Sequence, residues 1–67
     1  MNLKIEVERE EDGRWIAEVS SLPGCMVYGQ SQNEAVAKVK ALALRVMADR
    51  MEHGEPVPVG DELFSMA

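Results

Sequence analysis

The sequence between Ser31 and Gly54 contains neither glycine nor proline, and it takes up about a third of the 67-residue chain. Ser31 and Glu34 have the spacing of a capping box, in which each side chain satisfies a free backbone N–H group of the first helical turn. Gly54 supplies the left-handed residue that commonly ends a helix. We therefore predict one helix that begins after Ser31 and runs to His53, roughly 33 Å long at about 1.5 Å per residue.

Short strands are predicted before the helix. Apolar and polar residues alternate from Leu3 to Val7, a period of two that places one face of a strand on a core. Asp12-Gly13 is a strong hairpin signal, and the returning strand runs from Arg14 to Val19. After a turn at 20–24, a third strand is predicted from Cys25 to Gly29. Each strand reaches only about 20 Å, so part of the helix should extend beyond the sheet.

The residues that follow the helix predict an edge strand. Pro56 and Pro58 lie two positions apart, so one edge of an extended segment lacks backbone donors, while Val57 and Val59 can pair on the other. For residues 60–67 the sequence leaves open a short helical turn and an apolar tail. The predicted fold is α+β. It is a single two-layer domain over residues 1–67, with three antiparallel strands, a short C-terminal edge strand and one long helix, in the order β-β-β-α-β.

The predicted helix carries more apolar surface than one sheet needs. At 100° per residue, the stripe that should face the sheet consists of Ala35, Val39, Leu42 and Val46. A shoulder widens this apolar arc on one side, with Val36, Ala43, Leu44, Met47 and Met51. A chain this short also builds only a thin core. We therefore expect a homo-oligomer, a dimer or higher, with an interface formed by Leu44, Met47, Met51, Pro56, Val57, Pro58 and Val59.

The net charge of the chain indicates which kinds of partner it can bind. Seven Lys plus Arg against twelve Asp plus Glu give a formal net charge of −5. This charge repels phosphate backbones and anionic lipid surfaces, and it attracts a basic protein. No apolar run approaches the ~18–20 residues of a membrane span, and the N-terminus lacks a signal-peptide core. We expect a cytoplasmic protein that binds neither nucleic acid nor membranes directly.

Three carboxylates are predicted to share the outer face of the hairpin, namely Glu6, Glu8 and Glu18. Such a cluster is compatible with a Mg²⁺ site for phosphoryl chemistry, as in a metal-dependent nuclease. Charged residues on an outward strand face are also ordinary solvated groups. We favour the second interpretation and predict no metal site, no cofactor and no enzymatic activity.

The other residues suited to chemistry are few. Cys25 and His53 are the only cysteine and the only histidine, so neither a disulfide nor a Cys/His zinc site can form within one chain. Together they are compatible with a thiolate–imidazolium nucleophile, but a buried cysteine and a helix-terminal histidine are the favoured interpretation. Trp15 and Tyr28 are predicted to pack in the core rather than to stack on bases.

Several motifs follow one another in a specific order. An acidic-Gly turn and a Trp-x-Ala segment precede Leu22-Pro23-Gly24-Cys25, and Gly29-Gln30-Ser31-Gln32-Asn33-Glu34-Ala35 leads into the helix. In this order the chain resembles the HicB-like antitoxin family, from about Ile5 to Pro58. The resemblance implies a reduced ribonuclease-H-like β-β-β-α-β domain without catalytic acids. It also implies a partner, a small HicA-type toxin that is a messenger-RNA interferase, and an acidic domain suits its basic RNA-binding surface.

Many members of that family carry a second, DNA-binding domain, and this chain ends too soon to contain one, so we expect no autoregulation by this polypeptide alone. The predicted function is that of an antitoxin or antitoxin-derived module that neutralises a small basic toxin as a homo-oligomer. The alternative is a stand-alone oligomeric structural or adaptor protein without a toxin. The sequence leaves open the stoichiometry and any exchange of the last strand between protomers.

Overall fold

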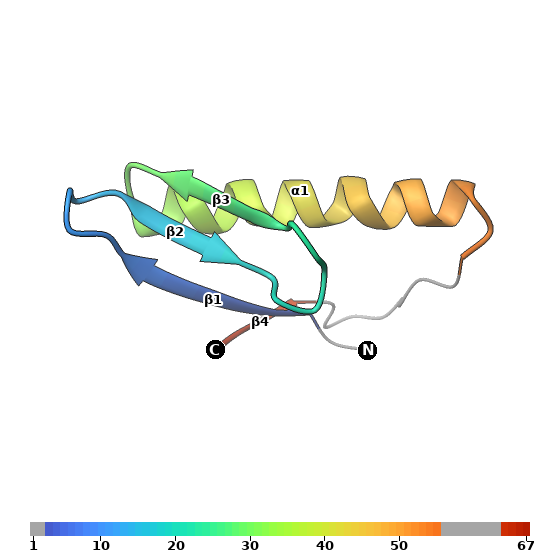
Figure 1. Ribbon diagram of the computed structural model, residues 1–67, viewed down its shortest axis with the longest axis horizontal. Coiled ribbons are helices and arrows are strands. Elements are labelled where there is room, and N and C mark those ends of the chain that lie inside the picture. Colours follow the sequence, from blue (N-terminus) through green and yellow to red (C-terminus); the bar gives the residue numbers. More distant parts are fainter. Residues whose placement is uncertain (1–2, 56–63) are drawn as a thin grey trace.

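The computed structural model describes residues 3–55 and 64–67, which form one sheet with one helix lying on it. Strands β1 (Leu3–Arg9), β2 (Trp15–Glu18) and β3 (Met26–Gly29) come first. Helix α1 (Gln32–Glu52) and strand β4 (Phe64–Met66) follow. The strand order is β3-β2-β1-β4, and α1 covers one face (Figure 1). The predicted α+β fold and the β-β-β-α-β order are therefore confirmed.

The two loops of the antiparallel part of the sheet depend on glycines with positive φ. Gly13 (φ 91°) closes the hairpin between β1 and β2, where the Asp12 carboxylate accepts the backbone N–H of Arg14 at 3.0 Å. Gly24 (φ 79°) closes the loop between β2 and β3. Leu22 in that loop is buried, because its side chain turns back into the core. Both predicted turns are present.

The ends of α1 are fixed by the predicted caps. The Ser31 hydroxyl accepts the N–H of Glu34 at 3.1 Å, and the Glu34 carboxylate accepts the N–H of Gln30 at 3.3 Å. At the other end, Gly54 has φ 76° and donates its N–H to the Met51 carbonyl, while Glu55 donates to Arg50. This pair of bonds is a Schellman motif, and it satisfies carbonyls that the helix end would otherwise leave without partners.

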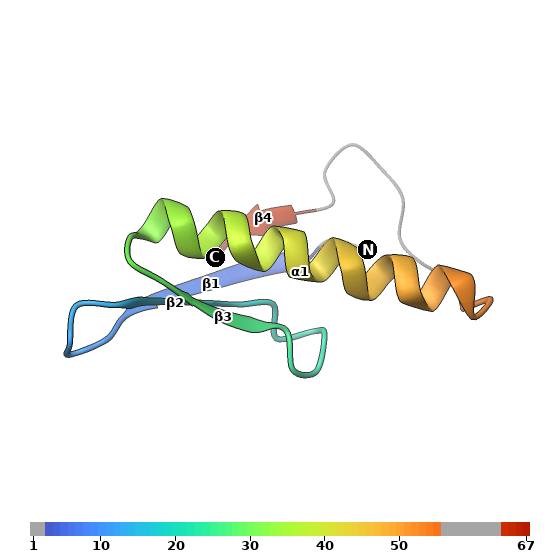
Figure 2. The same ribbon diagram turned by 90° about the horizontal axis from the view of Figure 1, so that it is seen from above.

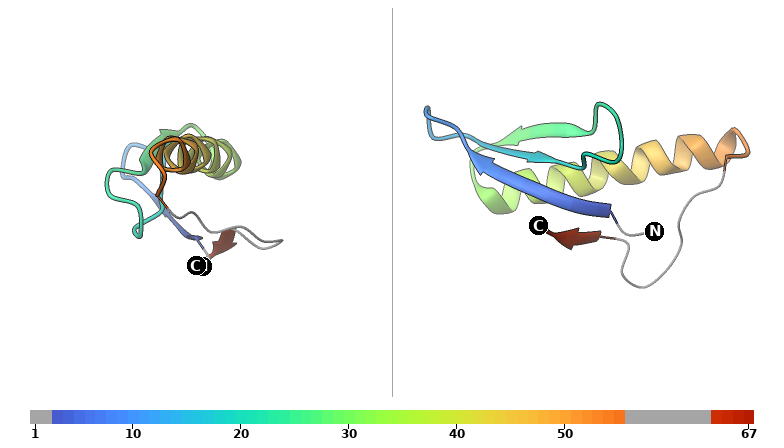
Figure 3. Two further views of the ribbon diagram at one scale, coloured as in Figure 1. Left: turned by 90° about the vertical axis from the view of Figure 1, so that its right-hand side faces the viewer. Right: turned by 60° about the horizontal axis from the view of Figure 1, so that its bottom comes forward.

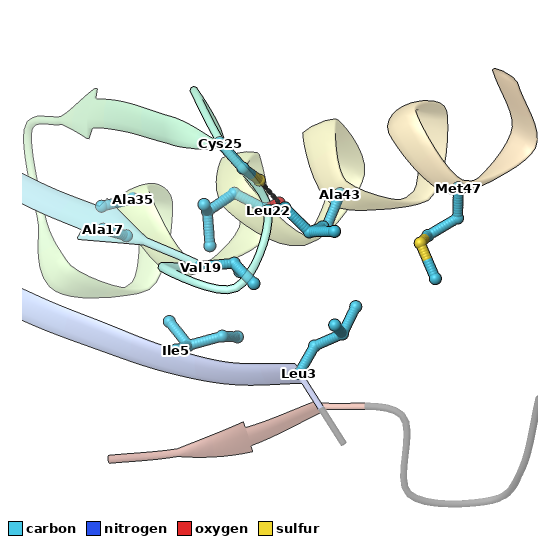
Figure 4. Close-up of a cluster of buried hydrophobic side chains, with 10 residues drawn as sticks. Leu3, Ile5, Ala17, Val19, Leu22, Cys25, Ala35, Ala43 and Met47 are labelled. Carbon is cyan, nitrogen blue, oxygen red and sulfur yellow. Dashed lines mark hydrogen bonds between the residues drawn. The ribbon is translucent and has the colours of Figure 1, made fainter. Parts of the chain in front are cut away.

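The core lies between α1 and the facing side of the sheet, as Figure 4 shows for Leu3, Ile5 and the residues around them. The buried row of the helix is Ala35, Val39, Ala43 and Met47. All four residues of the predicted stripe reach the core: Ala35 and Val39 are buried, and Leu42 and Val46 are half-buried and packed against it. Ala43 and Met47, which the sequence assigned to the shoulder, are buried as well. A row spaced by four residues is inclined to the helix axis, and it follows a sheet whose strands twist.

Helix α1 is longer than the sheet that it covers. Its 21 residues span about 32 Å, and its C-terminal part extends past the ends of the strands (Figure 1). Within the described part of the helix, no residue after Met47 is buried. The predicted overhang is therefore confirmed. Among the described residues, no helix combines the length and the hydropathy that a membrane span requires.

The structure describes a strand near the C-terminus of the chain. The predicted edge strand at Pro56–Val59 lies outside the described residues. The strand that the structure describes is β4, which pairs in parallel with β1 in the register Leu3↔Phe64 and Ile5↔Met66. For residues 64–66, the structure has a strand in place of both options that the sequence left open, the helical turn and the apolar tail. Phe64 and Met66 alternate with Ser65, so a strand turns both apolar side chains toward the helix side, where Phe64 packs against the core.

Candidate protein-binding site

The face of the sheet opposite α1 is the candidate binding surface. In an antiparallel pair, residues directly opposite one another point to the same side. The register places Glu6 beside Glu18 and Met26 in one row, and Glu8 beside Ile16 and Tyr28 in the next. We call the surface made by these two rows the outer face; it consists of Glu6, Glu8, Ile16, Glu18, Met26 and Tyr28.

A hollow of about 320 Å³ lies on the outer face, and its lining includes Ile16 with Glu6, Glu8 and Glu18 around it. Glu6 and Glu18 are direct cross-strand neighbours, an arrangement in which like charges destabilise a sheet. Among the described residues, the ion pairs join Asp12 to Arg14, Glu34 to Lys38 and Asp49 to His53, and none involves these three glutamates. The hollow therefore offers unneutralised carboxylates beside an apolar side chain.

The rest of the outer face is apolar and aromatic. Met26 and Tyr28 are both exposed, and the Arg14 guanidinium lies over the Tyr28 ring, 4.4 Å from its centroid. The core position predicted for Tyr28 is wrong. Strand β3 turns Val27 and Gly29 toward the helix, so Tyr28, which lies between them, must point outward. Trp15, in contrast, packs against the core from its edge.

The hairpin end of the outer face carries a fixed pair of charges. The Arg14 Nε atom lies 2.7 Å from Asp12 Oδ2. The backbone N–H of Arg14, and then its side chain, hold the pKa of Asp12 below the ordinary value for an aspartate. Asp12 is thus ionised at neutral pH and orients Arg14 over Tyr28.

The three glutamates share one face, as the sequence predicted, but the structure gives them no metal-binding arrangement. In the part of the chain that the structure describes, no group of three or more His, Cys, Asp or Glu side chains is placed to hold a metal ion. What the outer face can do chemically is to bind cationic side chains, because each carboxylate accepts hydrogen bonds from ammonium or guanidinium groups.

Cys25 and His53 are not brought together. Cys25 is 2% exposed, and burial raises the pKa of its thiol, which disfavours the thiolate. Its Sγ atom lies 4.0 Å from the Val39 carbonyl oxygen. His53 follows Val39 by fourteen positions, about 21 Å along the helix, and it is exposed with Nδ1 2.8 Å from the Asp49 carbonyl oxygen. Cys25 thus has the environment of a structural cysteine.

The predicted interface residues of the helix divide into two groups. Leu44 and Met51 are exposed by 51% and 57%, whereas Met47 is only 6% exposed because it closes the core near Leu3 (Figure 4). The predicted interface residues Pro56, Val57, Pro58 and Val59 lie outside the described residues.

A second hollow lies between the first half of α1 and β4. It measures about 550 Å³ and is lined by Gln32, Asn33, Val36, Ala37, Lys40 and Met66. The reason is that α1 packs mainly against β2 and β3, and the end-on view in Figure 3 shows β4 set apart from the helix. Sequence reasoning missed this hollow, because its two walls are far apart in the chain and the position of β4 was not predicted.

Comparison with known proteins gives two archaeal relatives. UPF0150 protein Ta0767 of Thermoplasma acidophilum is 28% identical over 58 residues, which cover 87% of this chain and 84% of that protein. A UPF0150 protein of Archaeoglobus fulgidus is 40% identical over 40 residues, which cover 60% of this chain and 58% of that protein. The chain is therefore similar to UPF0150 proteins. No protein-family model matches it, and no solved structure matches it significantly.

Proposed function

We propose that this chain is a HicB-like antitoxin, or a module derived from one, that binds and neutralises a small basic messenger-RNA interferase in the cytoplasm. It acts by covering the RNA-binding surface of its partner and has no catalytic role of its own. The observation that carries the proposal is the hollow of the outer face, where Glu6, Glu8 and Glu18 surround Ile16.

The outer face is complementary in charge to the surface that an RNA-binding protein displays. A surface that binds phosphate presents lysine and arginine side chains, and the same side chains suit a cluster of carboxylates. Binding a cation between Glu6 and Glu18 relieves the repulsion between these cross-strand neighbours. The net charge of −5 accelerates the encounter with a basic partner. The exposed Met26 and Tyr28 supply apolar contact area beside the charges.

Co-expression tests this function. The chain is produced together with the small basic protein encoded next to it, and growth, complex formation and messenger-RNA cleavage are measured. We expect a stable complex that restores growth and stops the cleavage. If no small basic neighbour binds the chain, the antitoxin proposal is wrong.

A pair of charge-matched variants tests the surface. Glu6→Lys with Glu18→Lys changes the outer face, whereas Glu11→Lys with Glu55→Lys makes the same charge change at exposed positions outside that face. We expect the first pair to weaken the complex at least tenfold, about 1.4 kcal/mol or more, and the second pair to keep most of the affinity. Circular dichroism shows whether each variant is folded. Equal affinity of a folded first pair would exclude the outer face as the binding site.

The exposed Leu44 and Met51 favour a second candidate function, that of a stand-alone oligomeric adaptor or structural protein. This candidate predicts a defined homo-oligomer and no toxin among the proteins that co-purify with the chain. The co-expression experiment separates the two candidates, because only the antitoxin restores growth.

A further inference from the structure

The side of α1 that faces away from the sheet carries a regular apolar seam. It consists of Ala37, Ala41, Leu44, Ala48 and Met51, all of which are exposed. The spacing alternates between four and three residues over two heptads, the pattern that helices use to pair side by side. The row that faces the core is a different one, with Ala35, Val39, Ala43 and Met47. The helix thus has one apolar row that packs on the sheet and another that is exposed.

We propose that two copies of this chain pair through this seam, with their α1 helices antiparallel and a two-fold axis at Leu44. The interface is isologous, so each copy contributes the same surface. The proposal does not depend on the toxin, because the seam and the outer face lie on opposite sides of the molecule.

The shape of the seam fits a second copy better than an unrelated chain. With the axis at Leu44, the two Leu44 side chains meet at the centre. Met51, seven positions later, then lies beside Ala37 of the other copy, seven positions earlier. Ala37 borders the 550 Å³ hollow next to β4, which gives the long Met51 side chain a place to enter. The alanines at the other seam positions let the two helices approach closely.

Charged residues beside the seam favour the antiparallel orientation. Lys38, Arg45 and Glu52 lie along one side of it, and Lys40 lies on the other. In the antiparallel pair, Lys38 comes within one helical turn of Glu52 of the other copy, twice by symmetry. A parallel pair instead places Lys40 against Arg45 of the other copy, a repulsive contact on both sides. Two kinds of like-charged contact occur in the antiparallel pair: the two Arg45 side chains meet near the axis, and Glu34, which Lys38 pairs with in its own copy, comes near Glu52 of the other copy.

The pairing also covers a part of the helix that the sheet leaves exposed. Met51 lies in the overhang, beyond the last buried residue Met47, and Leu44 is half exposed. Figure 2 shows the length of α1 against the shorter strands beneath it. A small domain gains stability from such association, because binding of a second copy to the folded state shifts the unfolding equilibrium.

Sedimentation equilibrium tests the dimer. We expect the chain to pass from monomer to dimer between about 1 and about 300 μM, since an interface of this modest size is weak. Leu44→Glu should raise the dimer dissociation constant at least tenfold, because it places two carboxylates at the axis. Glutamate is a good helix former and position 44 is exposed, so the monomer should remain folded. A wild-type chain that stays monomeric over this range would overturn the proposal.

A charge exchange tests the contacts beside the seam. Lys38→Glu and Glu52→Lys should each weaken the dimer several-fold, and the double variant should restore most of the lost affinity. Lys38→Glu also removes an ion pair with Glu34, so its helix content is checked by circular dichroism. If the double variant is as weak as the sum of the single variants, the proposed contact between positions 38 and 52 is absent.

Disulfide formation tests the orientation. A mixture of the Ala37→Cys and Met51→Cys variants should form the mixed disulfide under mild oxidation, whereas neither variant alone should cross-link with itself. The native Cys25 is buried and stays out of the reaction. A self-cross-link of Ala37→Cys would show a parallel pair and contradict the proposal.

Leu44→Glu leaves the outer face intact, so loss of the dimer and loss of toxin binding are distinguishable.

Discussion

At the scale of single residues, Gly29 sets the distance between β3 and the start of α1. Its φ is not in the left-handed region, so its backbone conformation does not require glycine. A Cβ atom at this position, however, would lie 2.6 Å from the backbone nitrogen of Ala35 and 2.9 Å from its Cα atom. Helix backbone cannot yield as a flexible side chain does. Gly29 is therefore needed for space.

Replacing Gly29 by alanine should destabilise the domain by about 1–3 kcal/mol, the usual cost of overpacking. That is a large share of what a core of this size provides. Urea unfolding monitored by circular dichroism measures the change. Gln30→Ala is the matched control at the exposed neighbouring position, and it should stay within about 0.5 kcal/mol of the wild type. A Gly29→Ala variant as stable as the wild type would show that β3 can move away from the helix.

Glu34 links the stability of the helix start to pH. Its pKa is lowered from the ordinary value of 4.5, first by the hydrogen bond from Lys38 and then by the N–H of Gln30. A lowered folded-state pKa stabilises the fold above pH 4.5, and this contribution is lost as the pH falls through the folded-state pKa. The stability difference between wild type and Glu34→Gln should therefore be constant at neutral pH and shrink in acid.

Urea unfolding at several pH values between neutrality and acid measures this difference. Lys38→Gln removes the first cause of the shift, so it should reduce the pH dependence contributed by Glu34. A difference that does not change with pH would mean that the ion pair, with its 3.0 Å separation, is not maintained in solution.

At the scale of elements, β4 joins the sheet through only a few residues. It pairs with β1 over Phe64–Met66, and the N–H of Ala67 donates to the Ile5 carbonyl at 2.9 Å. Phe64 packs against the core, whereas Met66 on the same side of the strand is 50% exposed. The attachment of this strand should thus depend mainly on one side chain.

Phe64→Ala should cost about 1–3 kcal/mol of stability, less than the ~3–5 kcal/mol of a fully buried phenylalanine, because Phe64 is only half-buried. Met66→Ala is the control in the same strand and should cost less than about 1 kcal/mol. Urea unfolding gives both values, and hydrogen exchange at Ala67 reports whether β4 stays paired with β1. Equal costs for the two variants would show that β4 contributes little packing to the core.

At the scale of the whole molecule, the two proposed interfaces occupy opposite sides. The outer face presents carboxylates from β1 and β2, and the seam of α1 points away from the sheet. The proposed dimer, paired through α1, leaves both outer faces accessible, so the two proposals together predict two basic partners per dimer. The sheet and the helix each turn one face to the core between them and leave the other face exposed, so both proposed interfaces fit on a chain of this size.

The features that the sequence alone determined are local. The capping residues Ser31 and Gly54 defined both ends of α1, and Asp12-Gly13 defined the hairpin, because each depends on hydrogen bonds or backbone angles within a few residues. The period of two in β1 and β2 likewise predicted the shared face of Glu6, Glu8 and Glu18, which the structure confirms.

Only the tertiary structure decided how these elements meet. The packing of the helix on the sheet buried Ala43 and Met47 fully and left Leu42 and Val46 half-buried beside them, and the pleat of β3 turned Tyr28 outward. Pairing with β1 placed the last strand at Phe64–Met66. Each outcome depends on contacts between residues far apart in the chain, and a local pattern does not specify which distant residues meet.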